Sequence, residues 1–149
     1  MHFYYDKMEY RDVVMANYVI NINEVEQIKS AQMDFLRTVV EKELEYKGPL
    51  TYYLEQINEK LIRMHFILQV DKWRILEGKK MFSQSYYGFD NMICIRSTVE
   101  ELNNLEQILP KMTEQAKADG YEVYGPLYYV FSKIPDDNIV YLKMPIQKL

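Results

Sequence analysis

The segment Gly48-Pro49-Leu50-Thr51-Tyr52-Tyr53-Leu54 returns in outline further along the chain as Gly125-Pro126-Leu127-Tyr128-Tyr129-Val130-Phe131. The two segments are 125 − 48 = 77 positions apart, and the same shift carries Ile57 onto Ile134. Self-similarity at a fixed separation indicates an internal repeat, in which each copy is one supersecondary unit. The sequence therefore predicts two copies of one unit in tandem.

Each copy also carries a signal for the start of a helix. Asn21-Ile22-Asn23-Glu24 and, at the same shift, Thr98-Val99-Glu100-Glu101 both read Asn/Thr-x-x-Glu, a pattern in which the first side chain caps backbone N–H groups and the glutamate reaches back. Apolar residues follow at helical spacing. We expect one helix from about residue 23 to 46. A second should end at Asp119-Gly120, with a kink or a break near Ile108, because Pro110 removes one helical hydrogen bond.

Four runs alternate between apolar and polar residues, two after each predicted helix, as half-buried strands do. They are residues 50–54, 62–68, 127–131 and 140–146. The second pair is joined by a turn at Pro135-Asp136-Asp137. One further strand candidate, rich in β-forming residues, precedes each helix: Asp12 to Ile20, and Met92 to Arg96 with an extension back to about Met81. Each copy is thus a β-α-β-β unit.

The predicted fold class is α+β, with tandem β-α-β-β units, an antiparallel sheet and two main helices. We expect one domain over residues 1–149, with repeats at about 10–70 and 81–147. The segment between the copies, 71–89, fits neither unit, and its first part is interpreted as a connector. The length of 149 residues, with 48% hydrophobic and 27% charged residues, is that of an ordinary folded domain.

Charge and cysteine content bound the partners and the compartment. The formal net charge is −4 and no dense Lys/Arg cluster occurs, so we expect neither nucleic acid nor an anionic membrane as partner. Cys94 is the only cysteine, which is typical of a reducing compartment and of a small buried apolar residue. The first ten residues are not a signal peptide, and no stretch has the length of a membrane span. We expect a cytoplasmic protein.

The candidate binding residues lie on the strand faces opposite those that the helices cover, because successive side chains of a strand point to opposite faces. These residues are Thr51, Tyr53, Glu55, Arg63, His65 and Ile67 in the first copy, and Tyr128, Val130, Ser132, Tyr141, Lys143 and Pro145 in the second. Tyrosines mixed with a few ionisable groups are typical of a ligand groove. A sheet solvated on one face has the same alternation.

Two ionisable residues in this set have more than one interpretation. Glu55 faces Arg63 across the predicted hairpin, which favours a salt bridge, although a partly buried carboxylate among tyrosines would also bind a cation or act as a general base. His65 is interpreted as structural rather than catalytic. No metal-ligand spacing, phosphate-binding loop or nucleophile motif occurs, so we predict no metal and no cofactor and assign no catalytic residue.

The duplicated unit, closing on the run Ile139 to Ile146, resembles the gyrase-inhibitor-like small-molecule-binding family, which also supplies effector-binding domains of multidrug-responsive transcription regulators. The resemblance implies a cleft lined by aromatic residues between the two halves, often with a glutamate four residues before the closing proline. Here that position is Tyr141, which argues against binding of cationic drugs and against the hydrolase activity of some relatives. The resemblance also implies a small bacterial family without an assigned function. No helix-turn-helix is present to make an intact regulator.

The sequence therefore predicts a stand-alone module that binds a small apolar or aromatic ligand. The predicted ligand-binding residues are Tyr53, Glu55, Arg63, His65, Tyr128, Tyr141 and Lys143. A protein-interaction role, in which the tyrosine-rich face docks a partner protein or a second copy of the chain, stays open as the alternative. Hydrolysis by Glu55 or His65 is the third hypothesis, and the sequence favours binding over catalysis.

Overall fold

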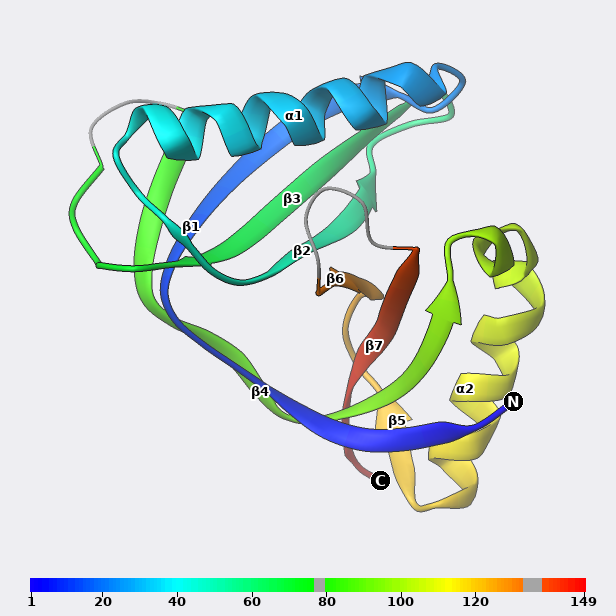
Figure 1. Ribbon diagram of the computed structural model, residues 1–149. Coiled ribbons are helices and arrows are strands. Elements are labelled where there is room, and N and C mark those ends of the chain that lie inside the picture. Colours follow the sequence, from blue (N-terminus) through cyan, green and yellow to red (C-terminus); the bar gives the residue numbers. More distant parts are fainter. Residues whose placement is uncertain (77–79, 133–137) are drawn as a thin grey trace. The chain divides into compact units, whose positions relative to one another are not determined.

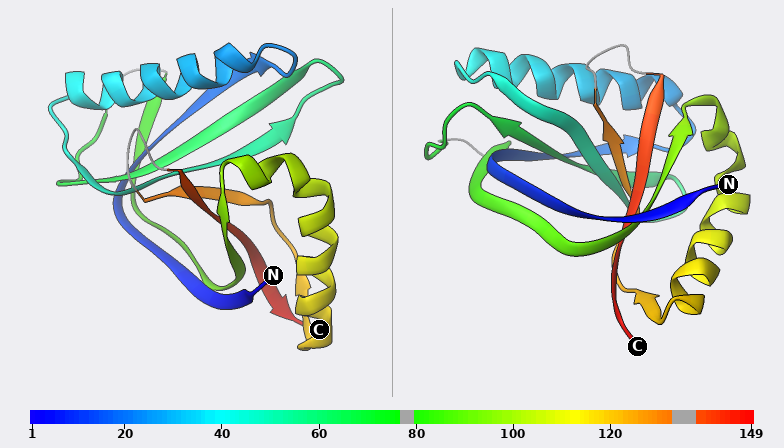
Figure 2. Two further views of the ribbon diagram at one scale, coloured as in Figure 1. Left: turned by 45° about the vertical axis from the view of Figure 1, so that its right-hand side comes forward. Right: turned by 60° about the horizontal axis from the view of Figure 1, so that its bottom comes forward.

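The computed structural model describes residues 1–76, 80–132 and 138–149 of the chain. Within these residues it has seven strands, two α-helices and one 3-10 helix (Figures 1 and 2), so the predicted α+β class is confirmed. In chain order the elements are β1 (Phe3–Asn21), α1 (Val25–Glu41), β2 (Tyr46–Gln56), β3 (Leu61–Val70), β4 (Met81–Thr98), the 3-10 helix η1 (Glu100–Asn104), α2 (Leu105–Ala118), β5 (Tyr121–Val123), β6 (Tyr128–Phe131) and β7 (Ile139–Lys148).

The chain divides into two compact units. The first unit is Tyr10–Tyr87, and the second unit combines Met1–Glu9 with Gly88–Leu149. The boundaries fall inside β1 and β4, the two longest strands. The predicted extension of β4 back to Met81 is confirmed. The predicted turn at 135–137 lies outside the described residues.

The first unit packs α1 against an antiparallel sheet of β1, β3 and β2. Tyr52 pairs with Phe66 across β2 and β3, and the Phe66 ring is stacked on Phe35 of α1 at 4.9 Å between ring centroids. Tyr18 of β1 and Tyr52 meet the same ring edge-on. This aromatic group fixes which strand face lies under the helix (Figure 1).

Helix α1 ends at Glu41, earlier than the predicted residue 46. Glu43 adopts a left-handed backbone with φ of 60°, its N–H bonds the carbonyl of Val40, and the N–H of Leu44 bonds the carbonyl of Val39. These two bonds form the Schellman motif that ends many helices. This helix end is not apparent from the sequence, because the left-handed position, usually glycine, holds a glutamate here.

The second unit packs α2 against β4 and β7, over a core made mostly of aliphatic side chains. The buried members are Ile93, Ile95, Ile108, Met112, Ala116, Val140, Leu142, Met144 and Ile146. Register is set by direct pairing, with Ile95 opposite Leu142 and Ile93 opposite Met144. On β6, Tyr129 pairs with Leu142 of β7.

Of the kink or break predicted near Ile108, the break does not occur, because α2 runs without interruption from Leu105 to Ala118. The helical path changes instead at Leu105, where the 3-10 turn η1 gives way to α2. Pro110 removes the donor for the carbonyl of Glu106, an exposed residue. Because the carbonyl of an exposed residue can bond to water instead, the loss does not require a break in the helix.

The two predicted helix caps have different outcomes. The N–H and the hydroxyl of Thr98 both donate to the carboxylate of Glu101, at 3.3 and 3.1 Å, and the N–H of Glu101 donates back to the Thr98 hydroxyl. This is the reciprocal capping box. Asn21 caps nothing in α1. Its side chain accepts from the Asn23 N–H, and its own N–H donates to Gln27 at 2.7 Å.

Both Gly-Pro segments lie at irregular points of the sheet. In the first unit, Tyr46 of β2 pairs with Val70 of β3, and the next pair is Leu50 with Leu68. The chain therefore advances four residues on β2 and only two on β3 between these pairs. In the second unit, β5 and β6 both pair with β7. Val123 of β5 pairs with Ile146 and Tyr128 of β6 pairs with Lys143, so the chain between the two pairs is longer on the β5–β6 side than on β7. Strand β5 is an element that the sequence analysis did not predict.

Candidate functional site

Four of the predicted binding residues gather on the strand face of the first unit that points away from α1. Tyr53 pairs with His65, and Glu55 pairs with Arg63, across β2 and β3. The Tyr53 and His65 rings are stacked, with 4.3 Å between centroids and 6° between planes. We call these four residues the Tyr53 cluster.

Glu55 holds the charged part of the Tyr53 cluster together. Its Oε1 accepts a hydrogen bond from Arg63 at 3.3 Å and lies 3.0 Å from Nε2 of His65. The hydrogen bond from His65, followed by the charge of Arg63, lowers the pKa of the Glu55 carboxyl. Burial, followed by the charge of Glu55, raises the pKa of Tyr53. Glu55 is therefore ionised and already paired at neutral pH, so it is a weak general base.

The other three predicted residues share the face of the second unit that points away from α2. Tyr128 of β6 pairs directly with Lys143 of β7, and Tyr141 precedes Lys143 by two positions on the same face. The Lys143 Nζ lies 3.4 Å from Oδ2 of Asp6, with the lysine side chain only 13% exposed. Tyr128 is buried, and its ring lies 5.4 Å from that of Phe89.

These faces are not uniformly solvated. Thr51 and Ile67 in the first unit are fully buried, as are Tyr128 and Val130 in the second to within a few per cent. The Thr51 hydroxyl is hydrogen-bonded to that of Tyr10 at 2.8 Å. A sheet face that is solvated throughout would leave such side chains in water. The interpretation of these faces as a solvated sheet surface therefore does not hold for these positions.

A pocket of about 570 Å³ opens beside Tyr141 in the second unit. The described residues that line it are Met1, His2, Tyr4, Ile95, Arg96, Glu101 and Tyr141. We call it the Tyr141 pocket. Of the seven residues predicted from the sequence, Tyr141 is the one that lines it.

Three strands and a cap position these side chains. Arg96 of β4 pairs directly with Tyr141 of β7, Tyr4 comes from the first residues of β1, and Glu101 belongs to the capping box. Burial, followed by the neighbouring Cys94 and Tyr141, raises the pKa of Tyr4 to about 12, so its phenol is neutral at physiological pH. The sequence analysis missed Tyr4 because it did not predict a strand before Asp12.

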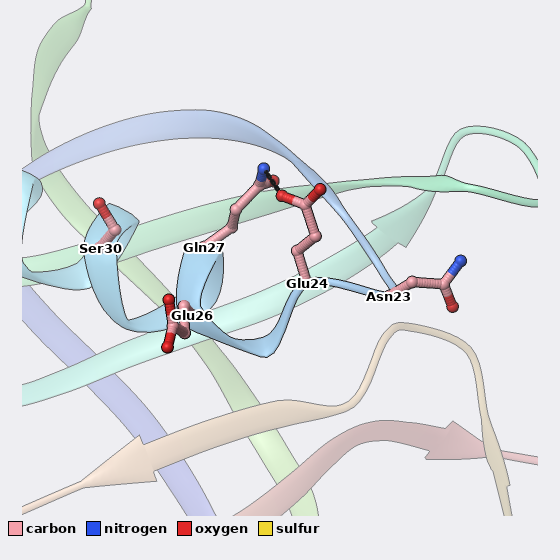
Figure 3. A pocket seen from close by; sticks show the side chains of 5 residues that line it. All are labelled: Asn23, Glu24, Glu26, Gln27 and Ser30. Atoms are coloured by element: carbon pink, nitrogen blue, oxygen red, sulfur yellow. Dashed lines mark hydrogen bonds between the residues drawn. The ribbon is translucent and has the colours of Figure 1, made fainter.

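Two further pockets lie in the first unit, and neither contains a predicted binding residue. One, of about 480 Å³, is at the start of α1 and is lined by Asn23, Glu24, Glu26, Gln27 and Ser30. Figure 3 shows the hydrogen bond between Gln27 and Glu24 at its rim. The other, of about 420 Å³, follows the Tyr18 to Ile20 part of β1 and includes Asp34 and Lys80. Both are open, and neither has an aromatic pair among its lining residues.

Among the described residues, neither Cys94 nor a cluster of metal-ligating side chains offers an alternative site. The Cys94 side chain is buried, and burial raises the pKa of its thiol to about 12, so it is a protonated apolar residue at neutral pH. In the described part of the chain, no group of three or more His, Cys, Asp or Glu side chains is placed to hold a metal ion. Over the same residues, no helix is long and apolar enough to span a bilayer.

Solved structures share this α+β fold at low sequence identity. The C-terminal domain of EcmrR matches with a TM-score of 0.65 and 13% identity over the full length of both chains. EcmrR in complex with DNA matches with a TM-score of 0.67 and 12% identity over 99% of this chain, which spans 58% of the EcmrR chain. A hydrolase from Listeria innocua matches with a TM-score of 0.64 and 9% identity, over 96% of this chain and 91% of that one. These likenesses define the fold.

The family model that matches is described as a domain of unknown function, DUF5085, and it covers residues 3–148. The chain belongs to this family. A search of curated proteins gives no match.

Proposed function

We propose that this protein is a small-molecule-binding module and that the Tyr141 pocket is its ligand site. The observation that carries the proposal is the pocket itself. Its volume of about 570 Å³ lies within the range of roughly 300 to 1,000 Å³ typical of ligand sites. Tyr4 and Tyr141 offer apolar ring surface, and Arg96 and Glu101 offer a few polar groups for orientation.

Two further observations support a binding role. The fold is shared with the C-terminal domain of a protein that has been solved in complex with DNA, which fits a separable module attached to a regulator. The resemblance to effector-binding domains, drawn from the sequence, predicts the same kind of role. The Tyr53 cluster, Tyr128 and Lys143 stay predicted ligand contacts, and each set is a separate target for mutation.

The test is a thermal-unfolding screen of the whole chain against aromatic and aliphatic small molecules, neutral and of both charges. A ligand that binds only the folded state stabilises it by about 2.7 kcal/mol at a concentration of 100 times its Kd. Hits should lose most of their effect in Tyr141→Ala and keep it in Tyr124→Ala, which removes an exposed tyrosine of the same unit outside the pocket. No hit across the library, or hits that Tyr141→Ala leaves unchanged, would contradict the proposal.

A protein-interaction role is the second candidate, and exposed apolar side chains favour it. Trp73 is 48% and Ile75 76% exposed in the first unit, and Tyr86 is 42% exposed. Aromatic residues are enriched at interfaces. Light scattering coupled to gel filtration would detect a dimer, and Trp73→Ala should dissociate it. Hydrolysis has less support, because neither Glu55 nor His65 lines any of the three pockets described above, and a catalytic base needs a sheltered substrate position.

A further inference from the structure

Arg96 is a charged group of the Tyr141 pocket that pairs with none of the described residues. The other cations on the sheet faces discussed above are paired: Arg63 with Glu55, and Lys143 with Asp6. Among the described residues, Arg96 has neither an ion pair nor a hydrogen bond through its side chain. It is nevertheless held at the pocket by its strand, directly opposite Tyr141.

The carboxylate in the same pocket is already engaged. Glu101 accepts hydrogen bonds from the Thr98 N–H and hydroxyl, and these bonds fix the carboxylate at the start of η1. The capping box thereby offsets part of its negative charge. Tyr4 and Tyr141 are phenols, and the raised pKa of Tyr4 keeps that ring uncharged. The pocket thus combines aromatic walls with one guanidinium that no described residue pairs with.

We propose that the Tyr141 pocket selects an aromatic small molecule that carries a carboxylate, with Arg96 binding the carboxylate and the Tyr4 and Tyr141 rings contacting the apolar part. The inference rests on the proposed function and adds the chemical class of the ligand. A guanidinium presents two parallel N–H donors that match the two carboxylate oxygens. Aromatic rings then pack against the tyrosines in offset or edge-on contacts.

A cationic ligand fits this pocket less well. It would gain from the faces of Tyr4 and Tyr141, but it would also be repelled by the positive charge of Arg96. Glu101 would have to leave the capping box to form an ion pair with it. A neutral ligand would leave the guanidinium partly desolvated without a partner, which is costly.

The test compares three probes of one shape by titration calorimetry on the whole chain: 2-naphthoate, 2-naphthylmethanol and 2-naphthylmethylammonium. Binding of the anion should be roughly tenfold tighter than that of the other two, the size of one charged hydrogen-bond pair. Arg96→Gln should remove this preference, and Arg96→Lys should keep part of it. Lys111→Gln, which removes the same charge from an exposed site on α2 outside the pocket, should leave all three affinities unchanged.

The outcomes separate this inference from the function on which it rests. If the probes bind and Tyr141→Ala weakens them, but the cation or the alcohol binds as tightly as the anion, the anionic class is wrong and the binding function stands. The same holds if Arg96→Gln leaves the naphthoate affinity unchanged. If no probe binds and the broader screen finds no ligand, both proposals fail. A thermal-unfolding scan of each variant confirms that the fold is intact before the affinities are compared.

Discussion

The two units build a similar helix-on-sheet layer with different core chemistry. The first unit centres on Phe66, which is stacked on Phe35 at 4.9 Å and met edge-on by Tyr18 and Tyr52. The buried core of the second unit has aliphatic side chains around Met112 and the small Ala116 of α2. The comparison teaches that the alternation of apolar and polar residues fixes which face is buried, while the kind of apolar residue is free to vary.

The largest expected effect is the loss of the central ring in the first unit. Phe66→Ala should lower the free energy of unfolding by about 3–5 kcal/mol, because it leaves a cavity and removes three ring contacts at once. Phe66→Leu keeps most of the volume and should cost much less. Urea unfolding followed by circular dichroism measures both changes.

Leu142→Ala in the second unit is the matched comparison, since Leu142 is also fully buried. It should cost about 2–5 kcal/mol through the cavity alone. Phe66→Leu replaces the ring by an aliphatic side chain, whereas Leu142→Ile changes only the shape of an aliphatic side chain, so the difference between their costs reports the ring contacts. Equal costs for these two conservative changes would show that the aromatic geometry of the first unit contributes nothing beyond apolar area.

The second prediction concerns the two glycines that begin the Gly-Pro-Leu segments. A Cβ added at Gly125 would lie 2.7 Å from Cγ of Pro145, which belongs to a rigid buried ring, whereas one added at Gly48 would lie 2.6 Å from the end of the Gln69 side chain. A side-chain end can rotate away and a proline ring cannot. Gly125→Ala should therefore cost about 1–3 kcal/mol, and Gly48→Ala clearly less.

Pro145→Ala supplies the control for Gly125, because it removes the ring atoms that a new Cβ would meet. The cost of Gly125→Ala should fall when Pro145→Ala is already present, so the double-mutant cycle should show strong coupling. The cost of Gly48→Ala comes from moving Gln69, whose Oε1 accepts the Arg11 N–H at 2.8 Å. A larger cost at Gly48 than at Gly125 would contradict this account.

The sequence predicted the parts of the fold that depend on local pattern. The strand runs, the faces under the helices and the Thr98 capping box all follow from alternation and capping rules, and all are present. The end of α1 was missed because Glu43 takes a backbone conformation that favours glycine. The break expected near Ile108 does not occur in α2, and the sequence pattern does not reveal whether the carbonyl freed by Pro110 belongs to an exposed residue.

The candidate site was less accessible from the sequence than the fold. The Glu55 to Arg63 contact followed from hairpin register, but the contact of Glu55 with His65 is diagonal across the strands and needs coordinates. Arg96 lies in a predicted strand, so the sheet face to which it points follows from the alternation of side chains along that strand. Faces were assigned in this way only for the hairpin strands. Tyr4 and Asp6 belong to a part of β1 whose charged residues hid the strand pattern.

The smallest expected effect is the loss of a tyrosine-carboxylate hydrogen bond, which each unit contains. Tyr18 of β1 donates to Asp34 of α1 at 2.8 Å, and Tyr5 donates to Asp119 just after α2. Each bond lowers the pKa of its aspartate as the largest cause. The Asp34 side chain is 31% exposed, so its bond should contribute more than that of the exposed Asp119.

Tyr18→Phe should lower the free energy of unfolding by about 1.5 kcal/mol at pH 7, the value of a hydrogen bond to a charged group. Because the pKa of Asp34 is lower folded than unfolded, this contribution is present above the unfolded pKa of about 3.9 and is lost as pH falls through the folded pKa. The difference between wild type and Tyr18→Phe should therefore shrink below about pH 4. Tyr5→Phe should behave in the same direction with a smaller change.

Tyr46→Phe is the matched control, since the Tyr46 hydroxyl donates to the carbonyl of Leu36 at 3.4 Å and touches no carboxylate. Its effect on stability should stay constant from pH 7 to acid, because no group with a shifted pKa in that range is removed. Urea unfolding of wild type and the three variants at pH 7, 5 and 3 gives the comparison. If the effect of Tyr18→Phe is as independent of pH as that of Tyr46→Phe, the bond to Asp34 does not hold its carboxylate ionised. The two units would then differ less in their tyrosine-carboxylate bonds than in their cores.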